Sequence, residues 1–235
     1  MAKILTSIVA ENLSQMVEQH QLLPKTHFSE RQGRSTTATI HRITTAWREN
    51  KVVSVLLLDV EGTFPNAVPA KLIHNLKKRH TPTSIINFIK QLLNNRKTRL
   101  KFDDYTSVTI TVTNGIGQGD LLSMILYILY NANILEIPNN PQKEDEIGYI
   151  DNIALLVIVV NLIKATKIIK NMMTRDKGSQ DWSLTHNSTV EVIKSTISHF
   201  SRKTEQRPQL RKWMHTNNEA TTNTGKSNGS GSKLL

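Results

Sequence analysis

The feature that most constrains this chain is a run of β-branched residues and leucines, Val52 to Leu58, which only Ser54 interrupts. Such a run is typical of a strand that is buried on both faces of a sheet. Asp59 follows directly, and Gly62 and Pro65 then break the pattern. The sequence therefore predicts a buried strand with a carboxylate at its end.

A second carboxylate occupies a comparable position later in the chain. Residues 147–160 are predicted to form a hairpin with Asp151-Asn152 at its tip, because Asn and Asp suit tight turns. Two strand-end aspartates that meet in space form an oxygen-rich site for Mg²⁺. Two such ions, about 3.5–4 Å apart, serve in-line phosphoryl transfer. Taken separately, Asp59 is also an ordinary turn residue or helix cap, and Asp151-Asn152 an ordinary turn.

A glycine-rich loop, Asn114 to Asp120, lies between the two acids and precedes an apolar segment over 121–135 that is expected to be a buried helix. Backbone N–H groups at a helix start favour phosphate, and the side chain of Gln118 can hydrogen-bond a base or the template backbone. The loop lacks the lysine and spacing of a P-loop. The three parts occur in a defined order: a strand that ends in Asp59, then Gln118-Gly119, then a hairpin with Asp151. Together, in this order, they favour nucleotide chemistry more strongly than any one of them does alone.

Four further side chains are candidates for nucleotide contacts. The ring of Phe64 can pack under a nucleotide sugar and exclude a 2′-hydroxyl, although an isolated Phe is more often simply a core residue. Arg31 and Arg34 can grip phosphate oxygens, or they belong to a solvated loop. Lys194 can protonate a leaving pyrophosphate, or it is a surface charge in a strand expected within 189–200.

The charge balance favours a polyanionic partner. The formal net charge is +11, and basic clusters occur at 77–80 and 96–99, which suit backbone phosphates or solvated helix ends. The absence of cysteine excludes zinc-thiolate sites and thiol nucleophiles. The longest apolar run, 153–160, is shorter than the roughly 20 residues that cross a bilayer. We therefore expect an intracellular protein with no membrane partner.

The remaining patterns predict the following elements: helices over 1–23, 37–47, from Pro69, from Thr81-Pro82 to about 95, and over 161–174; a hairpin of 98–102 with 106–113 around Asp103-Asp104; and an exposed loop over 138–146. Thr81 is predicted to be the N-cap of its helix, with Pro82 at the first helical position. From 206 to 235 the chain becomes rich in Asn, Thr, Gly and Ser, so this tail is expected to be disordered.

Five blocks in this order resemble the reverse transcriptase domain of non-LTR (LINE-type) retrotransposons, of the kind abundant in fungal genomes, with the best match over 13–204. The blocks are Leu22-Leu23-Pro24 with Phe28, Arg31 and Gly33-Arg34-Ser35-Thr36; Leu58-Asp59-Val60 with Gly62 and Phe64; Asn114-Gly115 with Gly117-Gln118-Gly119-Asp120; Tyr149-Ile150-Asp151; and His199-Phe200-Ser201-Arg202-Lys203. The resemblance implies an α+β right-hand polymerase fold over 1–205, with fingers and a palm whose antiparallel sheet has helices packed on one face.

The resemblance also implies a reaction and its participants. A DNA primer would be extended with dNTPs on an RNA template, with Mg²⁺ or Mn²⁺ bound by Asp59 and Asp151. Phe64 resembles the sugar gate of the family. Gln118 and Gly119 resemble the motif that contacts template and incoming nucleotide. Arg31 and Arg34 resemble fingers residues near the triphosphate, and the nucleus is the expected location.

Departures from the family pattern predict a weak or inactive polymerase. Asn152 replaces the second aspartate of the hairpin, which should lower metal affinity without abolishing it. Leu121 stands where a proline usually follows Asp120, and a thumb is expected to be missing after Gln206. A truncated copy is one interpretation. A non-catalytic basic nucleic-acid-binding remnant and a fragment without stable structure are the alternatives, and the oligomeric state is left open.

Overall fold

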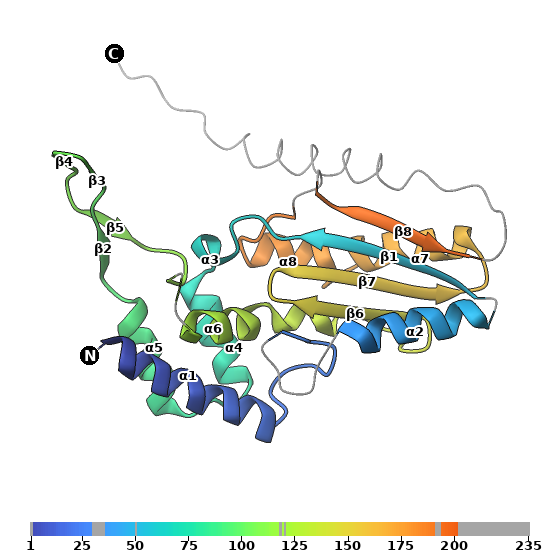
Figure 1. The fold of residues 1–235 in the computed structure, drawn as a ribbon, viewed down its shortest axis with the longest axis horizontal. Coiled ribbons are helices and arrows are strands. Elements are labelled where there is room, and N and C mark those ends of the chain that lie inside the picture. Colours follow the sequence, from blue (N-terminus) through green and yellow to red (C-terminus); the bar gives the residue numbers. More distant parts are fainter. Residues whose placement is uncertain are drawn as a thin grey trace, which may run out of the picture.

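The fold combines helices with one main antiparallel sheet, as expected for an α+β chain (Figure 1). The computed structural model describes residues 2–29, 36–49, 51–117, 119, 121–190 and 194–201. The predicted tail, 206–235, lies outside these residues. In the part that is described, no helix is long and apolar enough to cross a membrane.

The strand order in the main sheet is β6-β7-β1-β8, and all its neighbours are antiparallel. Its strands are β1 (Val52–Asp59), β6 (Glu144–Tyr149), β7 (Asn152–Val159) and β8 (Thr196–Phe200). The helices are α1 (Ala2–Gln19), α2 (Thr36–Arg48), α3 (Thr63–Asn66), α4 (Pro69–Lys78), α5 (Thr83–Leu93), α6 (Leu121–Asn131), the 3₁₀ helix η1 (Ala132–Glu136), α7 (Leu162–Thr174) and α8 (Ser179–Thr185). A separate hairpin contains β2 (Arg96–Thr98), β3 (Lys101–Phe102), β4 (Tyr105–Thr106) and β5 (Ile110–Val112).

Strand β1 is central and buried on both faces, as its composition predicts. Leu56 and Leu58 face a core that includes residues of α7 and α8. Val53 and Val55 point to the other face and pack with Ala46 of α2. The prediction that helices cover only one face of the sheet was therefore wrong, because alternate side chains of an apolar strand need cover on both sides.

A second core lies beside the sheet, where α1, α4 and α5 surround α6 (Figure 1). The predicted burial of α6 is confirmed: from Leu122 to Asn131, every residue except Met124 is buried. A helix that is apolar on all sides is stable in water only when other helices enclose it. The core around α6 therefore fixes α4 and α5 relative to the sheet.

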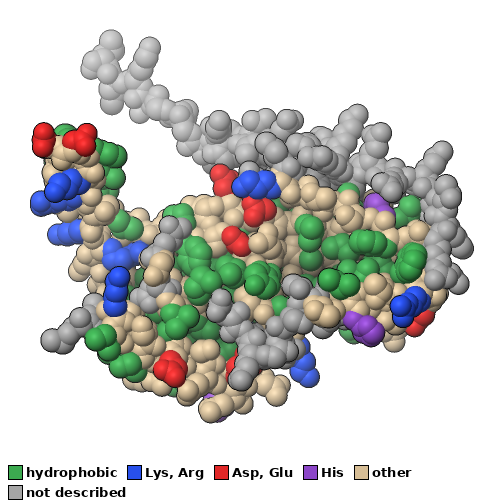
Figure 2. All heavy atoms as spheres, in the orientation of Figure 1, with side chains coloured by type: hydrophobic (Ala, Val, Ile, Leu, Met, Phe, Trp, Pro, Cys, Tyr) green, Lys and Arg blue, Asp and Glu red, His purple; other side chains and the backbone are tan. Residues whose placement is uncertain are grey.

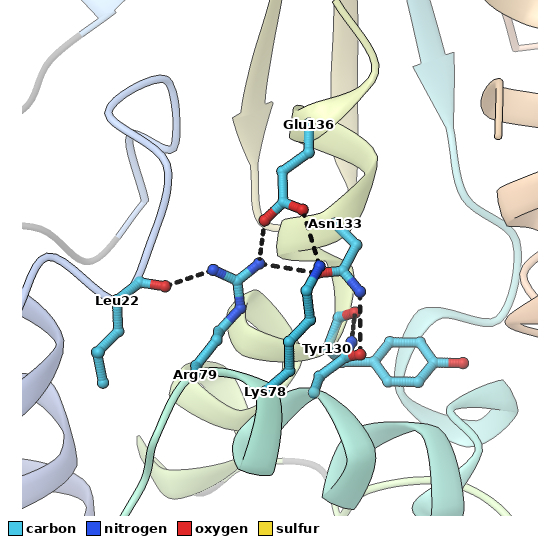
Figure 3. Close-up of polar contacts among 7 residues, drawn as sticks. Leu22, Lys78, Arg79, Tyr130, Asn133 and Glu136 are labelled. Atoms are coloured by element: carbon cyan, nitrogen blue, oxygen red, sulfur yellow. Dashed lines mark hydrogen bonds and ion pairs between the residues drawn. The ribbon is translucent and has the colours of Figure 1, made fainter.

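A polar network ties α4 to α6, η1 and the segment after α1 (Figure 3). The guanidinium of Arg79 donates to the carbonyl of Leu22 at 2.5 Å, to Oδ1 of Asn133 at 2.8 Å and to Oε1 of Glu136 at 2.7 Å. The buried Asn75 donates to the carbonyl of Tyr130 at 2.8 Å and accepts from Asn133 at 3.0 Å. The basic cluster at the end of α4 thus makes internal contacts, although its sequence suits phosphate binding.

Removing the side chain of Asn75 is expected to destabilise the fold. Asn75→Ala leaves the Tyr130 carbonyl and the Asn133 amide without this partner in a buried site, which costs about 1–3 kcal/mol. Chemical unfolding monitored by circular dichroism would measure the change. Lys77→Ala, on the exposed side of the same helix, is the control and should unfold like the unmodified chain. Equal stability of the two variants would contradict a structural role for the network.

Several predicted boundaries were wrong. Helix α5 starts at Thr83 with Pro82 as its N-cap, so Thr81 is not the capping residue. Strand β6 starts at Glu144 rather than at 147, because Glu144 and Glu146 point inward and hide the alternation of polar and apolar residues. In the 189–200 segment, only 196–200 is strand among the described residues.

Candidate active site

The ends of β1 and β7 bring the candidate acids to one edge of the sheet. The register of the antiparallel pair places Asp59, the last residue of β1, directly opposite Asn152, the first residue of β7. Residues directly opposite in such a pair have Cα atoms about 4.5–5.5 Å apart. Asp151 immediately precedes Asn152 in the turn, so two carboxylates lie at the adjoining ends of two paired strands.

The turn before β7 differs in one detail from the predicted hairpin. Tyr149 pairs with Asn152, so the two turn residues are Ile150 and Asp151, and Asn152 already belongs to the strand. Ile150 has φ +55°, a conformation that is uncommon for a branched side chain. The side-chain amide of Asn131, in α6, donates to the carbonyl of Ile150 and so ties this turn to α6.

Each carboxylate has specific neighbours. Oδ1 of Asp151 accepts from the Asn152 amide at 3.1 Å, and Oδ2 lies 3.5 Å from the hydroxyl of Thr63. Oδ2 of Asp59 lies 3.3 Å from the ammonium of Lys194, which is in a turn just before β8. Asp59 keeps 26% of its side-chain surface exposed, so both solvent and ligands reach it.

Tyr127 of α6 is buried near the two acids. Burial is the main cause that raises the pKa of its hydroxyl, and the negative charges of Asp151 and Asp59 raise it further. One buried phenol therefore senses both carboxylates, which agrees with their convergence at this edge. The ring of Phe64 packs against Tyr127, with 5.2 Å between the ring centroids.

The glycine loop is joined to the segment after β1 by backbone hydrogen bonds. The N–H of Gly115 donates to Ala67 at 2.7 Å, and that of Ile116 donates to Phe64 at 2.8 Å. Gly115 has φ +86°, and a Cβ there would lie 2.8 Å from the Pro65 carbonyl oxygen. Only glycine allows this close approach without strain. The loop thus lies against the backbone of Phe64.

Not all candidates can be located. Gly119 is described, with φ +81°, and lies in the loop before α6. Arg31, Arg34 and Gln118 lie outside the described residues. Arg96 from the second basic cluster donates to the carbonyls of Asn114 at 2.9 Å and Gly115 at 2.7 Å, so its guanidinium holds the glycine loop.

The donor set at this edge suits a hard divalent cation. Carboxylate oxygens are preferred ligands of Mg²⁺, and Asp59 already has a cationic ammonium within ion-pair distance. In the described part of the chain, no group of three or more His, Cys, Asp or Glu side chains gathers to hold a metal ion. A cation here would have two carboxylates, with water, substrate phosphate or backbone oxygens completing its coordination.

The sequence profile of the family described as "Reverse transcriptase (RNA-dependent DNA polymerase)" matches residues 1–175, which is well over half of the chain. The chain belongs to the reverse transcriptase family. This membership, together with the mobile-element relatives described next, confirms the resemblance to reverse transcriptases of LINE-type retrotransposons. The family implies dependence on a divalent metal in general. The fungal origin stays a prediction.

Curated relatives of this reverse transcriptase come from mobile elements of fruit flies. The probable RNA-directed DNA polymerase from transposon BS of Drosophila melanogaster is 27% identical over 165 residues, covering 66% of this chain and 18% of the relative. The RNA-directed DNA polymerase from mobile element jockey of the same species is 22% identical over 216 residues, covering 88% of this chain and 23% of the relative. The chain thus spans about a fifth of the length of these relatives.

Solved structures with a similar fold include telomerases of Candida tropicalis. The apo enzyme truncated from its C-terminal domain has a TM-score of 0.58 and 12% identity, covering 85% of this chain and 40% of that one. The enzyme in complex with a fragment of telomeric RNA has a TM-score of 0.58 and 11% identity, covering 85% and 34%. At this identity the likeness shows the polymerase fold.

Two residues next to the candidate acids were not predicted from the sequence. Thr63 lies in α3, a four-residue helix that its sequence does not signal, and its hydroxyl donates to the Val60 carbonyl at 3.0 Å. Tyr127 lies in a helix that is apolar nearly all round, so its hydroxyl does not stand out. A polar hydroxyl inside such a helix is the one signal that could have marked it, because buried tyrosines usually serve a polar neighbour.

Proposed function

We propose that this reverse transcriptase chain extends a DNA primer with dNTPs on an RNA template. The observation that carries the proposal is the register of β1 and β7, which brings Asp59 and Asp151 to adjoining strand ends beside the glycine loop. In this reaction the primer 3′-hydroxyl attacks the α-phosphate of the dNTP, and pyrophosphate leaves. The finer assignment of the main sheet to a palm and of the N-terminal helices to fingers belongs to the same proposal, as does a nuclear location.

Asp59 and Asp151 would hold Mg²⁺ or Mn²⁺. Bound there, the metal would activate the primer hydroxyl and stabilise the charge on the leaving phosphate. Thr63 and Asn152 orient the Asp151 carboxylate through the contacts at 3.5 and 3.1 Å. The Thr63 contact is at the outer limit of a hydrogen bond, so it restrains the Asp151 carboxylate without occupying it fully.

Lys194 and Phe64 would act on the nucleotide. The ammonium of Lys194 balances the charge of Asp59 at 3.3 Å and lies at the edge of the site, where it can donate a proton to the leaving pyrophosphate. Phe64 is half-buried and its ring packs against the Tyr127 ring, which supports the proposal that it excludes a 2′-hydroxyl. Gln118 and Gly119 are the proposed contacts to the template and incoming nucleotide, and Arg31 and Arg34 those to the triphosphate.

A second candidate function is nucleic-acid binding without synthesis. The contacts of the acids favour it in one respect: the Asn152 amide occupies an oxygen of Asp151, and Lys194 occupies an oxygen of Asp59. An amide in place of an acid also removes one negative charge from the site. Both effects weaken cation binding, and the formal net charge of +11 still attracts polynucleotides.

Restoring the second acid distinguishes the two functions. Asn152→Asp is expected to raise primer extension on an RNA template with Mn²⁺ by about tenfold or more, since 1.4 kcal/mol of added metal affinity suffices. Asn152 is exposed, so the change should not disturb folding. Asn152→Ala is the control, because it removes the amide without adding charge. Binding of RNA without extension in all three proteins would favour the second function.

A further inference from the structure

The hairpin from β2 to β5 projects away from the two cores (Figure 1). From Lys97 to Thr111 every residue is exposed except the half-buried Ser107. A two-stranded hairpin alone is at best marginally stable in water. An exposed hairpin of this length therefore suggests a surface that a partner covers.

The hairpin has a defined irregularity. The β2–β5 register runs from Arg96↔Val112 to Thr98↔Ile110, while the β3–β4 pairs shift the return strand by one residue. The extra residue is Val108, which lies between Thr109, bonded to Arg99 at 2.8 Å, and Ser107, whose N–H donates to Leu100 at 2.9 Å. This is a β-bulge, a feature that increases local twist and redirects side chains.

Aromatic and cationic side chains share the stem. The exposed apolar side chains are Leu100, Phe102, Tyr105, Val108 and Ile110, and the cations are Lys97, Arg99 and Lys101. Figure 2 shows cationic side chains along the stem and acidic ones at the tip, where Asp103 and Asp104 lie. Phe102 and Tyr105 are each 63% exposed and lie directly opposite each other, so both rings project from the same face.

The base of the hairpin is coupled to the candidate active site. Arg96, at the start of β2, donates to the carbonyls of Asn114 and Gly115. Gly115 in turn donates to Ala67, and the next residue, Ile116, donates to Phe64. The hairpin therefore rises from the loop whose backbone is bonded to that of Phe64.

We propose that this hairpin binds single-stranded nucleic acid outside the catalytic centre. Phe102 and Tyr105 stack on two bases from one face of the stem. Lys97, Arg99 and Lys101 alternate onto the other face and contact the phosphates of the strand as it passes the edge of the hairpin. Exposed aromatic rings on a stem that also carries cations suit unpaired bases, whose faces are free, rather than a duplex. Asp103 and Asp104, next to the rings, repel phosphate, so the backbone of the bound strand lies toward the base of the stem, where the cations are. The inference rests on the proposed polymerase function, because the bound strand would be the template.

The test uses the full chain and a fluorescein-labelled 20-nucleotide oligo(U), with binding followed by anisotropy. The double variant Phe102→Ala/Tyr105→Ala is expected to weaken binding by about tenfold or more, since stacking contributes about 1–3 kcal/mol per base. Binding of a duplex of equal length should change little. In the triple variant Lys97→Gln/Arg99→Gln/Lys101→Gln, affinity should depend less on salt. The slope of log affinity against log salt concentration should become less steep by about 0.7 for each lost phosphate contact.

The matched control is Asp103→Asn/Asp104→Asn at the tip, which should bind oligo(U) at least as tightly as the unmodified chain. Circular dichroism and unfolding curves of all variants would establish that the fold is kept. Unchanged oligo(U) affinity in the aromatic variant overturns the proposal. So does a dimer of the unmodified chain that the aromatic variant abolishes, because a second copy would then cover the hairpin. Hairpin-dependent binding without any primer extension by Asn152→Asp would instead contradict the polymerase function alone.

Discussion

Asp59→Asn is expected to abolish primer extension and to weaken Mn²⁺ binding by about a hundredfold or more. The carboxylate is one of two acids at the edge of the sheet, and a metal ion contributes several kcal/mol to the transition state, each 1.36 kcal/mol being a factor of ten. Asn keeps the shape and one oxygen but removes the charge. Asp59→Asn is introduced into the Asn152→Asp variant, and primer extension is measured with and without it. Mn²⁺ binding is followed in parallel by electron paramagnetic resonance, a measurement that does not depend on activity.

Glu61→Gln is the matched control for this change. Glu61 is an exposed acid two residues from Asp59, and its backbone N–H bonds to Thr189 at 2.8 Å, so the side chain is free to change without loss of that contact. It should bind Mn²⁺ and extend primers as before. A metal affinity that survives both Asp59→Asn and Asp151→Asn would mean that the cation is held elsewhere. Extension that survives both would refute the proposed mechanism.

The position of the acids could be predicted because each follows a local signal. A buried strand must end, and an Asp at its end remains accessible, so Asp59 and Asp151 stand out in the sequence. Their pairing depends on the register between β1 and β7, which only the complete sheet determines. Thr63 could not be predicted, since its contact with Asp151 depends on the fold rather than on any pattern near it. For Tyr127 the one local signal is a hydroxyl inside an otherwise apolar helix.

The limits of the fold prediction have physical causes. Burial was predicted correctly where the sequence has a long apolar run, as in β1 and α6. Helix α2 has polar and apolar residues mixed, and its packing on Val53 and Val55 depends on an open face of the sheet that the sequence does not reveal. Helix α8 is a short polar segment that buries Trp182. It is too short for its apolar residues to show a helical period in the sequence.

Two neighbouring glutamates on the inner face of β6 differ in whether a nearby cation balances their charge. Glu144 forms an ion pair with Arg175 at 2.9 Å, in which both side chains are nearly buried, and it accepts the N–H of Asn139 at 2.9 Å. Glu146 is fully buried. Burial is the main cause that raises its pKa well above the ordinary 4.5, and the positive charge of Arg175 offsets this only in part. Glu144 thus has a cationic partner, whereas burial opposes the charge of Glu146.

The same substitution should therefore change stability in opposite directions at neutral pH. Glu144→Gln leaves the buried Arg175 cation without its counter-charge, which costs about 3–5 kcal/mol. Glu146→Gln should stabilise the fold, because the folded state no longer has to bury a carboxylate that prefers to be protonated. Chemical unfolding at pH 7 measures both, and each variant is the control for the other. Destabilisation by Glu146→Gln of the same size as by Glu144→Gln would contradict this account.

The pH dependence gives an independent check. The folded pKa of Glu146 lies above the unfolded one, so its contribution to stability is full below about pH 4.5 and is lost as pH rises through the folded value. The unmodified chain should lose stability across that range relative to Glu146→Gln, and the difference between the two unfolding free energies should vanish at low pH. A constant difference at every pH would mean that packing around Glu146, rather than its ionisation, determines the effect.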